Sequence, residues 1–128
     1  MKHVETISLP HDLSEFTEII DVRSPLEFAE DHLPDAVNLP VLNDEERAKV
    51  GTLYKDNPFE ARRLGAALIS SNAAKHLKEH LADKDKTYAP LVYCWRGGMR
   101  SNSLAQILRS VGWRARLLDG GYKTFRSF

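Results

Sequence analysis

Short apolar runs alternate along the chain with polar segments that carry helix signals. The apolar runs fall at residues 4–7, 18–22, 90–93 and 113–118, and a very short one lies within 35–40. Their length is typical of β-strands, and no two of them are joined by a tight hairpin turn. We therefore predict an α/β fold, with a parallel sheet of about five strands and helices on both faces.

Helix starts are marked by polar residues that can cap a helix N-terminus. Four of these are followed three residues later by a glutamate, the spacing of a capping box: Asp12, Ser24, Asn43 and Asn57. Proline follows directly after the second and the fourth, at the first helical position. These signals predict a short helix after residue 12, one to about residue 31, one towards residue 54 and a long one to about residue 82.

The helical segments 58–82 and 101–111 differ in how regularly their apolar residues recur on one face. The stripe over 58–82 is interrupted and comprises Ala61, Leu64, Leu68, Leu77 and Leu81. Gly65 and residues 70–72 weaken this helix and predict a point where it can kink or break. The segment 101–111 is expected to end at Gly112 and to turn four residues towards the core: Leu104, Ile107, Leu108 and Val111. A turn at Gly120 and Gly121 precedes a last helix from Tyr122 onward.

The composition is that of an ordinary globular protein. The chain has 128 residues, 42% hydrophobic and 28% charged, which fits one folded domain over residues 1–128. No apolar run reaches the roughly 18 residues of a membrane span, and the N-terminus lacks the apolar core of a secretory signal. The single cysteine cannot form an internal disulfide, which favours the reducing cytoplasm. We expect a cytoplasmic protein with no membrane partner.

The charges are unevenly distributed, although the formal net charge is zero. Residues 94–128 contain seven arginines and lysines against one acidic residue, Asp119, so this segment carries +6 and residues 1–93 carry −6. A basic segment attracts anionic substrates. The sequence shows no interleaving of aromatic and basic residues, so solvated helix faces are favoured over RNA binding by this chain alone.

The only cysteine, Cys94, stands where an apolar run meets two glycines and a helix-like segment. Backbone N–H groups at a helix N-terminus hold anions, and their field favours the nucleophilic thiolate form of a cysteine. Gly97 and Gly98 let successive N–H groups turn inward, and Arg96 and Arg100 add positive charge. This pattern predicts a cradle for a nucleophilic sulfur that handles an anionic group.

We therefore expect Cys94 to be the catalytic residue. The residues expected to bind substrate around it are Trp95, Arg96, Gly97, Gly98, Met99 and Arg100. The alternative is a buried, inert cysteine at a strand end, as most lone cysteines are, but the glycines and arginines favour catalysis. For Trp95 the sequence leaves two roles equally open, a packing residue of the loop or an apolar wall for the substrate.

Histidines offer two weaker candidate sites. Residues 76–80 match the zinc-binding pattern H-x-x-E-H, but no third ligand is apparent, so we expect a helix surface and no metal. His32 precedes a leucine and a proline at a helix end, and we expect a structural or helix-dipole contact rather than a general base. No nucleotide-binding P-loop motif occurs, and no cofactor is expected.

Three segments resemble the signatures of rhodanese domains, and they appear in the family's order over most of the chain. The first comprises residues 20–23, 27–28 and 32–40, the second Tyr93 and Cys94 with the loop and helix that follow, and the third residues 118–122. The resemblance implies the rhodanese fold. It also implies a persulfide on Cys94, from which sulfur passes to a nucleophilic acceptor.

Two features are similar to the N-terminal rhodanese domain of the tRNA 2-selenouridine synthase family. The spacing from Cys94 to Arg100 is one residue longer than the common pattern of cysteine, four residues and arginine, and residues 50–65 are unusual for simple rhodaneses. That family replaces the sulfur of wobble 2-thiouridine in tRNA by selenium from selenophosphate, and it also geranylates the thiouridine. Its second domain, which carries a P-loop, is absent here, so we expect either part of a longer protein or a stand-alone homologue.

The resemblance implies a sulfur- or selenium-transfer domain whose donor is thiosulfate or selenophosphate. Transfer to tRNA is expected only together with the missing partner domain.

Two other functions stay open at this point. Cys94, five residues and Arg100 is also the C-x5-R spacing of cysteine phosphatases, in which arginine holds the phosphate and cysteine forms a phosphocysteine. The third function is a non-catalytic docking module of rhodanese fold, against which the intact cysteine argues.

Overall fold

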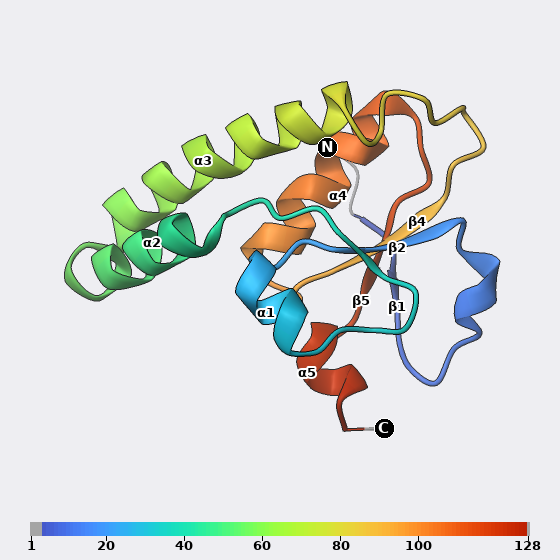
Figure 1. Cartoon of the computed structure of the whole chain (residues 1–128), viewed down its shortest axis with the longest axis horizontal. Helices are drawn as coiled ribbons and strands as arrows, with labels where there is room; N and C mark the ends of the chain where they lie inside the picture. Colours follow the sequence, from blue (N-terminus) through green and yellow to red (C-terminus); the bar gives the residue numbers. More distant parts are fainter. Residues whose placement is uncertain (1–3, 128) are drawn as a thin grey trace.

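The computed structural model describes residues 4–127. Helices and strands alternate along the chain (Figure 1). In the first half they are β1 (Thr6–Ile7), the 3-10 helix η1 (Leu13–Glu15), β2 (Glu18–Asp21), α1 (Pro25–Glu30), β3 (Val37–Asn38) and α2 (Asp44–Asp56). In the second half they are α3 (Pro58–Lys78), β4 (Pro90–Tyr93), α4 (Met99–Val111), β5 (Arg116–Leu118) and α5 (Gly121–Phe125).

The strands form one parallel sheet in the order β1-β5-β4-β2-β3. The central strand β4 is buried at every position, and its Val92 is in register with Ile20 of β2 and Leu117 of β5. This confirms the predicted parallel sheet; β4 has the predicted bounds, whereas the other four strands are shorter than their apolar runs. Because the strands are parallel, the loops that follow β2, β4 and β5 meet at one edge of the sheet.

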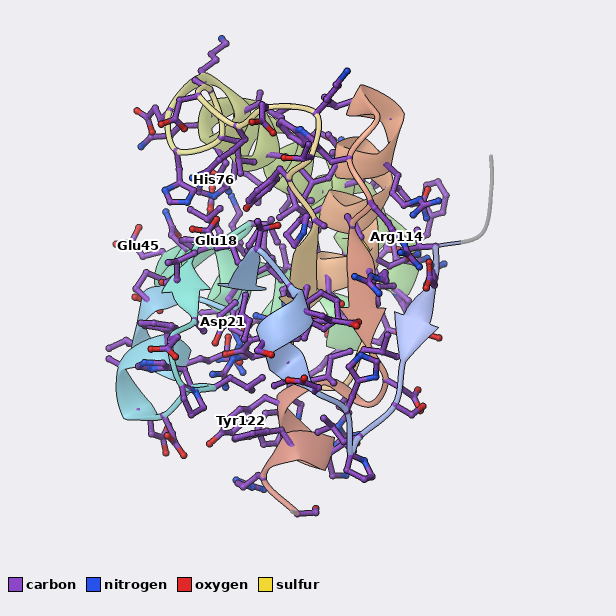
Figure 2. All side chains as sticks on the ribbon, turned by 90° about the vertical axis from the view of Figure 1, so that its right-hand side faces the viewer. Glu18, Asp21, Glu45, His76, Arg114 and Tyr122 are labelled. Atoms are coloured by element: carbon purple, nitrogen blue, oxygen red, sulfur yellow. The ribbon has the colours of Figure 1, made fainter. Side chains whose placement is uncertain are left out.

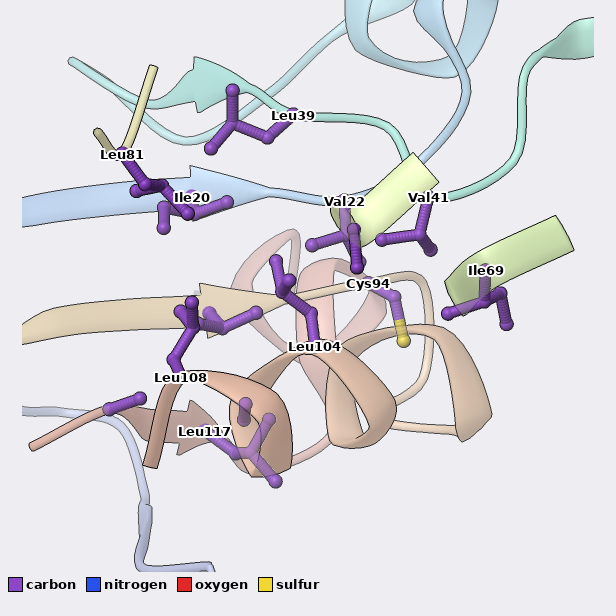
Figure 3. Packing of buried hydrophobic residues seen from close by; sticks show 14 of the residues in the cluster. Ile20, Val22, Leu39, Val41, Ile69, Leu81, Cys94, Leu104, Leu108 and Leu117 are labelled. Carbon is purple, nitrogen blue, oxygen red and sulfur yellow. The ribbon is translucent and has the colours of Figure 1, made fainter. Parts of the chain in front are cut away.

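Helices cover both faces of the sheet, as predicted. Side chains alternate along β4, so Val92 and the following Cys94 face α3 and α4, while Leu91 and Tyr93 face η1 and α5. Figure 3 shows the first of these faces, where Leu104 and Leu108 of α4 pack against the strands and Ile69 of α3 lies beside Cys94. The alternation thus places the cysteine in the core on the side of the long helices.

The long helix α3 is continuous over 21 residues, so the break predicted at Gly65 or residues 70–72 is wrong. The serines at 70 and 71 are exposed, and the Asn72 amide donates outward to the carbonyl oxygen of Val41 at 2.8 Å, so neither competes with the helix backbone. The buried line of the helix is Ala61, Gly65, Ile69 and Ala73, so of the stripe predicted within α3 only Ala61 belongs to it. Small residues at this spacing let α3 pack closely, while Leu64, Leu68 and Leu77 are only partly buried.

Several helix ends also differ from the predictions. The helix α3 ends at Lys78 instead of about residue 82, and α4 begins at Met99 instead of Ser101. The capping boxes of α1 and α2 are confirmed. Two predicted boxes have only the cap: Asp12 accepts from the Ser14 N–H, and Asn57 accepts from the Glu60 N–H. The glutamates expected to complete them pair with arginines instead: Glu15 with Arg116, and Glu60 with Arg63.

Val111 is another correction, because its side chain is 53% exposed and does not face the core. The buried face of α4 consists of Ser101, Leu104, Ala105 and Leu108. Val111 lies in the last turn, where the helix ends at Gly112 in a left-handed conformation, with φ of 114°.

Within residues 4–127, no helix has the length and apolar character that crossing a bilayer requires.

The two apolar positions on α4 give a matched test of this packing. Leu108→Ala should lower the free energy of unfolding by about 2–5 kcal/mol, because it leaves a cavity in the core. Val111→Ala should change it by no more than about 0.5 kcal/mol, because the side chain is exposed. Urea unfolding of both variants measures this, and similar losses for the two would contradict the described orientation of α4.

Candidate active site

Cys94 lies directly after β4, at the start of a loop that leads into α4. Its side chain is buried, and its Sγ accepts a hydrogen bond from the Gly98 N–H at 3.2 Å. The Ser101 hydroxyl lies 3.0 Å from Sγ, from the first turn of α4. Because α4 is 13 residues long, its N-terminal field acts on whatever negative charge the sulfur carries. The structure therefore brings together the strand end, the glycine loop and the helix N-terminus around this sulfur.

The first turn of α5 supports this loop from behind. The backbone N–H of Tyr122 donates to the carbonyl oxygen of Cys94 at 2.8 Å, and that of Lys123 donates to Trp95 at 2.9 Å. Gly121 makes this approach possible: a Cβ there would lie 2.4 Å from the carbonyl oxygen of Cys94, and its φ is 60°. The two loop carbonyls thus point towards α5, which leaves the loop N–H groups free to face the sulfur.

Arg100 is held by Glu27 of α1. Its two terminal nitrogens donate to the Glu27 carboxylate at 2.7 and 3.4 Å, and Nε of Arg47 lies 3.1 Å from the same carboxylate. The Ser24 N–H also donates to it, at 3.1 Å. The side chains of Glu27 and Arg100 are 13% and 17% exposed, so this pair is largely shielded from solvent. The carboxylate therefore joins α1, α2 and the start of α4.

These contacts determine the protonation state of Glu27. Burial by itself raises its pKa, but the hydrogen bond and charge of Arg100, helped by Ser24 and Arg47, hold the pKa below its usual value. Glu27 is therefore ionised at neutral pH and neutralises much of the positive charge of Arg100. For Arg100 to bind a substrate anion, as the sequence predicts, its terminal nitrogens have to exchange Glu27 for that anion.

A cavity of about 350 Å³ opens beside the cysteine. Apolar side chains from α2, α3, the segment before them and the start of α4 form most of its wall: Leu42, Val50, Tyr54, Ile69 and Met99. Cys94, Trp95, Arg96, Gly98 and Arg100 line it from the loop. Arg96 is exposed, and among residues 4–127 it makes no ion pair. Of the predicted loop residues, only Gly97 is outside the cavity wall; it shapes the loop instead, with φ of 74°.

The histidine candidates lie elsewhere. The Nε2 atom of His76 lies 2.7 Å from the carbonyl oxygen of Pro40, and that of His80 lies 3.0 Å from Glu18, so the two rings engage different partners. Figure 2 shows His76 and Glu18 at the end of the sheet opposite to Tyr122. Nδ1 of His32 lies 2.8 Å from the Phe28 carbonyl oxygen, and the two rings stack, which confirms a structural contact at the end of α1.

The sequence and the structure were compared with known proteins and protein families. The rhodanese-like domain model matches residues 8–127. This chain belongs to the rhodanese-like domain family. It is 46% identical over 114 residues to a tRNA 2-selenouridine synthase of Nitrosomonas europaea, covering 88% of this chain and 30% of that protein. A Bdellovibrio bacteriovorus protein of the same name is 37% identical and covers the whole chain and 34% of its own length.

Solved structures agree with this assignment. The N-terminal domain of a Clostridium difficile protein described as ATP/GTP-binding superposes with a TM-score of 0.82 at 34% identity, covering 97% of this chain and 98% of that one. A rhodanese-related protein of Thermoplasma volcanium shares the fold, with a TM-score of 0.61 at 16% identity over 96% of this chain and 91% of its own. The rhodanese-like chain described here spans about a third of the length of the curated relatives named above.

Sequence reasoning missed three contributors to this rhodanese-like site. Glu27 was identified as a helix cap and as part of a family signature, but not as the partner that holds Arg100. Arg47 and the Ser101 hydroxyl were not singled out at all, although one lines the cavity and the other contacts Sγ. Only Ser101 had a signal in the sequence: it directly follows Arg100. A hydroxyl at this position, in the first turn of the helix after the loop, can reach the sulfur of Cys94.

Two glycines provide a test of the backbone support. Gly121→Ala should lower the free energy of unfolding by at least about 1–3 kcal/mol, because a side chain there meets the Cys94 carbonyl and has to adopt a strained φ. Gly51→Ala is the matched control, since nothing lies within 4 Å of its added Cβ and the position is inside α2. It should stabilise the fold by up to about 1 kcal/mol. Equal effects in urea unfolding would contradict the close approach of α5.

Glu27 provides a pH-dependent test. The pKa of Glu27 is lowered on folding, so its contribution to stability is present at neutral pH and is lost as the pH falls through that lowered pKa. Glu27→Gln should therefore cost about 1.5–3 kcal/mol at pH 7, because Arg100 loses a charged partner. The difference from wild type should shrink in urea unfolding at about pH 3.5. A difference that does not depend on pH would show that the ion pair contributes nothing.

Proposed function

We propose that this chain is a chalcogen-transfer domain in which Cys94 carries sulfur or selenium as a persulfide or selenopersulfide. The observation that supports it most directly is the position of Sγ, which accepts from the Gly98 N–H at 3.2 Å at the N-terminus of α4. A terminal persulfide sulfur extends one bond further along this direction, where the backbone dipoles and Arg96 stabilise its negative charge. The rhodanese-like family assignment favours the same chemistry.

The loading step with thiosulfate follows from this arrangement. The Cys94 thiolate attacks the outer sulfur of thiosulfate, the new sulfur–sulfur bond forms, and the original one breaks as sulfite leaves with its electron pair. An acceptor such as cyanide then attacks the outer sulfur of the persulfide, leaves as thiocyanate and restores the thiolate. A reducing cytoplasm, which the single cysteine predicts, keeps the thiol available for this cycle.

The physiological acceptor is proposed from the relatives. Proteins named tRNA 2-selenouridine synthase match most or all of this chain, which spans about 30% of their length. We infer that selenophosphate is the donor in that context and that the acceptor is a 2-thiouridine in tRNA. Conversion of the base would then need the remainder of such a protein, with this chain supplying the loaded cysteine.

The contacts of Arg100 weigh against the phosphatase alternative. A C-x5-R phosphatase uses the terminal nitrogens of its arginine to hold the phosphate oxygens, whereas here both donate to Glu27 at 2.7 and 3.4 Å. A non-catalytic docking module would not need the contacts that Gly98 and Ser101 make to Sγ of Cys94. Chalcogen transfer uses the sulfur, the loop and the cavity together.

Thiosulfate:cyanide sulfurtransferase activity tests the proposal. Cys94→Ser should reduce the rate to that of the reaction without protein, because the hydroxyl cannot form a persulfide. Ser110→Ala, an exposed position at the far end of α4, is the matched control and should retain the wild-type rate. Retained activity in Cys94→Ser would refute the proposal.

An aryl phosphate distinguishes the phosphatase. The wild-type chain should not turn over p-nitrophenyl phosphate faster than Cys94→Ser does, because Arg100 is engaged by Glu27. Rapid turnover that is lost in both Cys94→Ser and Arg100→Lys would instead establish phosphatase chemistry, since lysine cannot bind two phosphate oxygens as arginine does.

A further inference from the structure

A second cavity, of about 320 Å³, adjoins the one that contains the cysteine, but Cys94 does not line it. We call it the polar cavity; its walls are Arg23, Glu27, Glu30, Asp31, Arg47, Trp95, Tyr122 and Arg126. Three of these residues follow the ends of β2, β4 and β5, so the cavity lies at the edge of the sheet where parallel folds bind ligands. Trp95 and Arg47 line both cavities, so the two sites are neighbours with a shared wall.

Arg23 is a buried charge that lines the polar cavity. Its side chain is 3% exposed, and its Nε and one terminal nitrogen donate to Asp21 at 2.8–3.1 Å. The same terminal nitrogen donates to the carbonyl oxygen of Asp31 at 2.6 Å. Its other terminal nitrogen has no hydrogen-bond acceptor among residues 4–127. A guanidinium that is fixed this firmly and retains an unused donor is suited to binding a polar ligand.

Aromatic and basic side chains alternate in space around this cavity, although they do not alternate in the sequence. The Arg126 guanidinium lies over the Trp95 ring, 5.0 Å from its centroid. The centroids of the Trp95 and Tyr122 rings are 5.8 Å apart, and the Arg23 guanidinium lies 4.3 Å from the Tyr122 centroid. Trp95 is half-buried beneath the Arg126 guanidinium, whereas Arg126 is exposed and accessible to a flat ligand.

The polar cavity also offers acceptors. Glu30 and Asp31 are exposed at the end of α1. The Tyr122 hydroxyl and the backbone N–H of His32 donate to the Asp31 carboxylate and hold its pKa below the usual value. Asp31 is therefore an ionised acceptor at neutral pH. The volume is at the lower end of the roughly 300–1,000 Å³ of ligand sites. Stacking surfaces, guanidinium donors and carboxylate acceptors together match the base, phosphate and ribose hydroxyls of one nucleotide of single-stranded RNA.

We propose that the polar cavity binds a nucleotide of the acceptor RNA adjacent to the reacting base, with Trp95 separating it from Cys94. This inference rests on the proposed function, because it assumes that the acceptor is an RNA base. It extends that function by assigning RNA contacts to this chain itself. The bound base stacks on the Arg126 guanidinium, which itself lies over the Trp95 ring, and Arg23 supplies its unused donor to a polar group of the nucleotide.

The test is binding of a fluorescein-labelled heptaribonucleotide with a central 2-thiouridine, followed by anisotropy at about 0.15 M salt. Arg126→Ala should weaken binding at least about tenfold, because a stacking and charged contact is lost. Lys123→Ala removes the same charge from an exposed site on α5 that does not line the cavity, and it should change affinity no more than about twofold. The RNA should also quench tryptophan fluorescence, and this quenching should disappear in Trp95→Phe because Trp113 is buried.

Equal losses for Arg126→Ala and Lys123→Ala would overturn the proposal, because they would indicate non-specific attraction to positive charge. Absence of measurable binding by the wild-type chain, or quenching that persists in Trp95→Phe, would overturn it as well. Cys94→Ser separates this inference from the proposed function, since the cavity does not need the thiol. If the wild-type chain fails to take up sulfur but binds RNA in an Arg126-dependent way, the transfer function is wrong and the RNA site stands. Sulfur uptake without such binding refutes the RNA site alone.

Discussion

The contact between the start of α5 and the cysteine loop is the constraint on which the site depends. Two backbone N–H groups of α5 bind the carbonyl oxygens of Cys94 and Trp95, at 2.8 and 2.9 Å, and only a glycine at 121 permits the approach. With these carbonyls turned away, the Gly98 N–H can face the sulfur. The anion-binding geometry is therefore built from backbone, at the edge of a parallel sheet whose central strand is fully buried.

Because the backbone forms the cradle, the arginines around it are available for other tasks. Arg100 joins the start of α4 to α1 through Glu27, and Arg23 joins the end of β2 to the end of α1 through Asp21 and the Asp31 carbonyl. Between them Trp95 divides the edge of the sheet into an apolar cavity that contains the thiol and a polar cavity that does not. This division fits a transfer reaction, in which one side holds the carrier sulfur and the other positions the acceptor.

Much of this arrangement could be predicted from the sequence, because it depends on local signals. Capping residues located α1 and α2, and the glycines after Cys94 located the loop at a strand end. Contacts between distant segments could not be predicted, since nothing local to Glu27 or Arg100 marks them as partners. Most of the buried line on α3 was missed for a related reason: apart from Ala61, leucines dominate the hydrophobicity pattern, whereas close helix packing selects Gly65 and Ala73. The spatial alternation of Trp95 and Arg126 likewise exists only once α5 folds back onto the loop.

The central claim is that Cys94 carries the transferred chalcogen, and intact-protein mass spectrometry tests it most directly. The wild-type chain and Cys94→Ser are incubated in parallel with thiosulfate and with selenophosphate, and excess donor is removed before measurement. We expect thiosulfate to increase the mass of the wild-type chain by one sulfur atom, cyanide to reverse this increase, and Cys94→Ser to show no increase. An unchanged wild-type mass, or the same increase in both proteins, would contradict it.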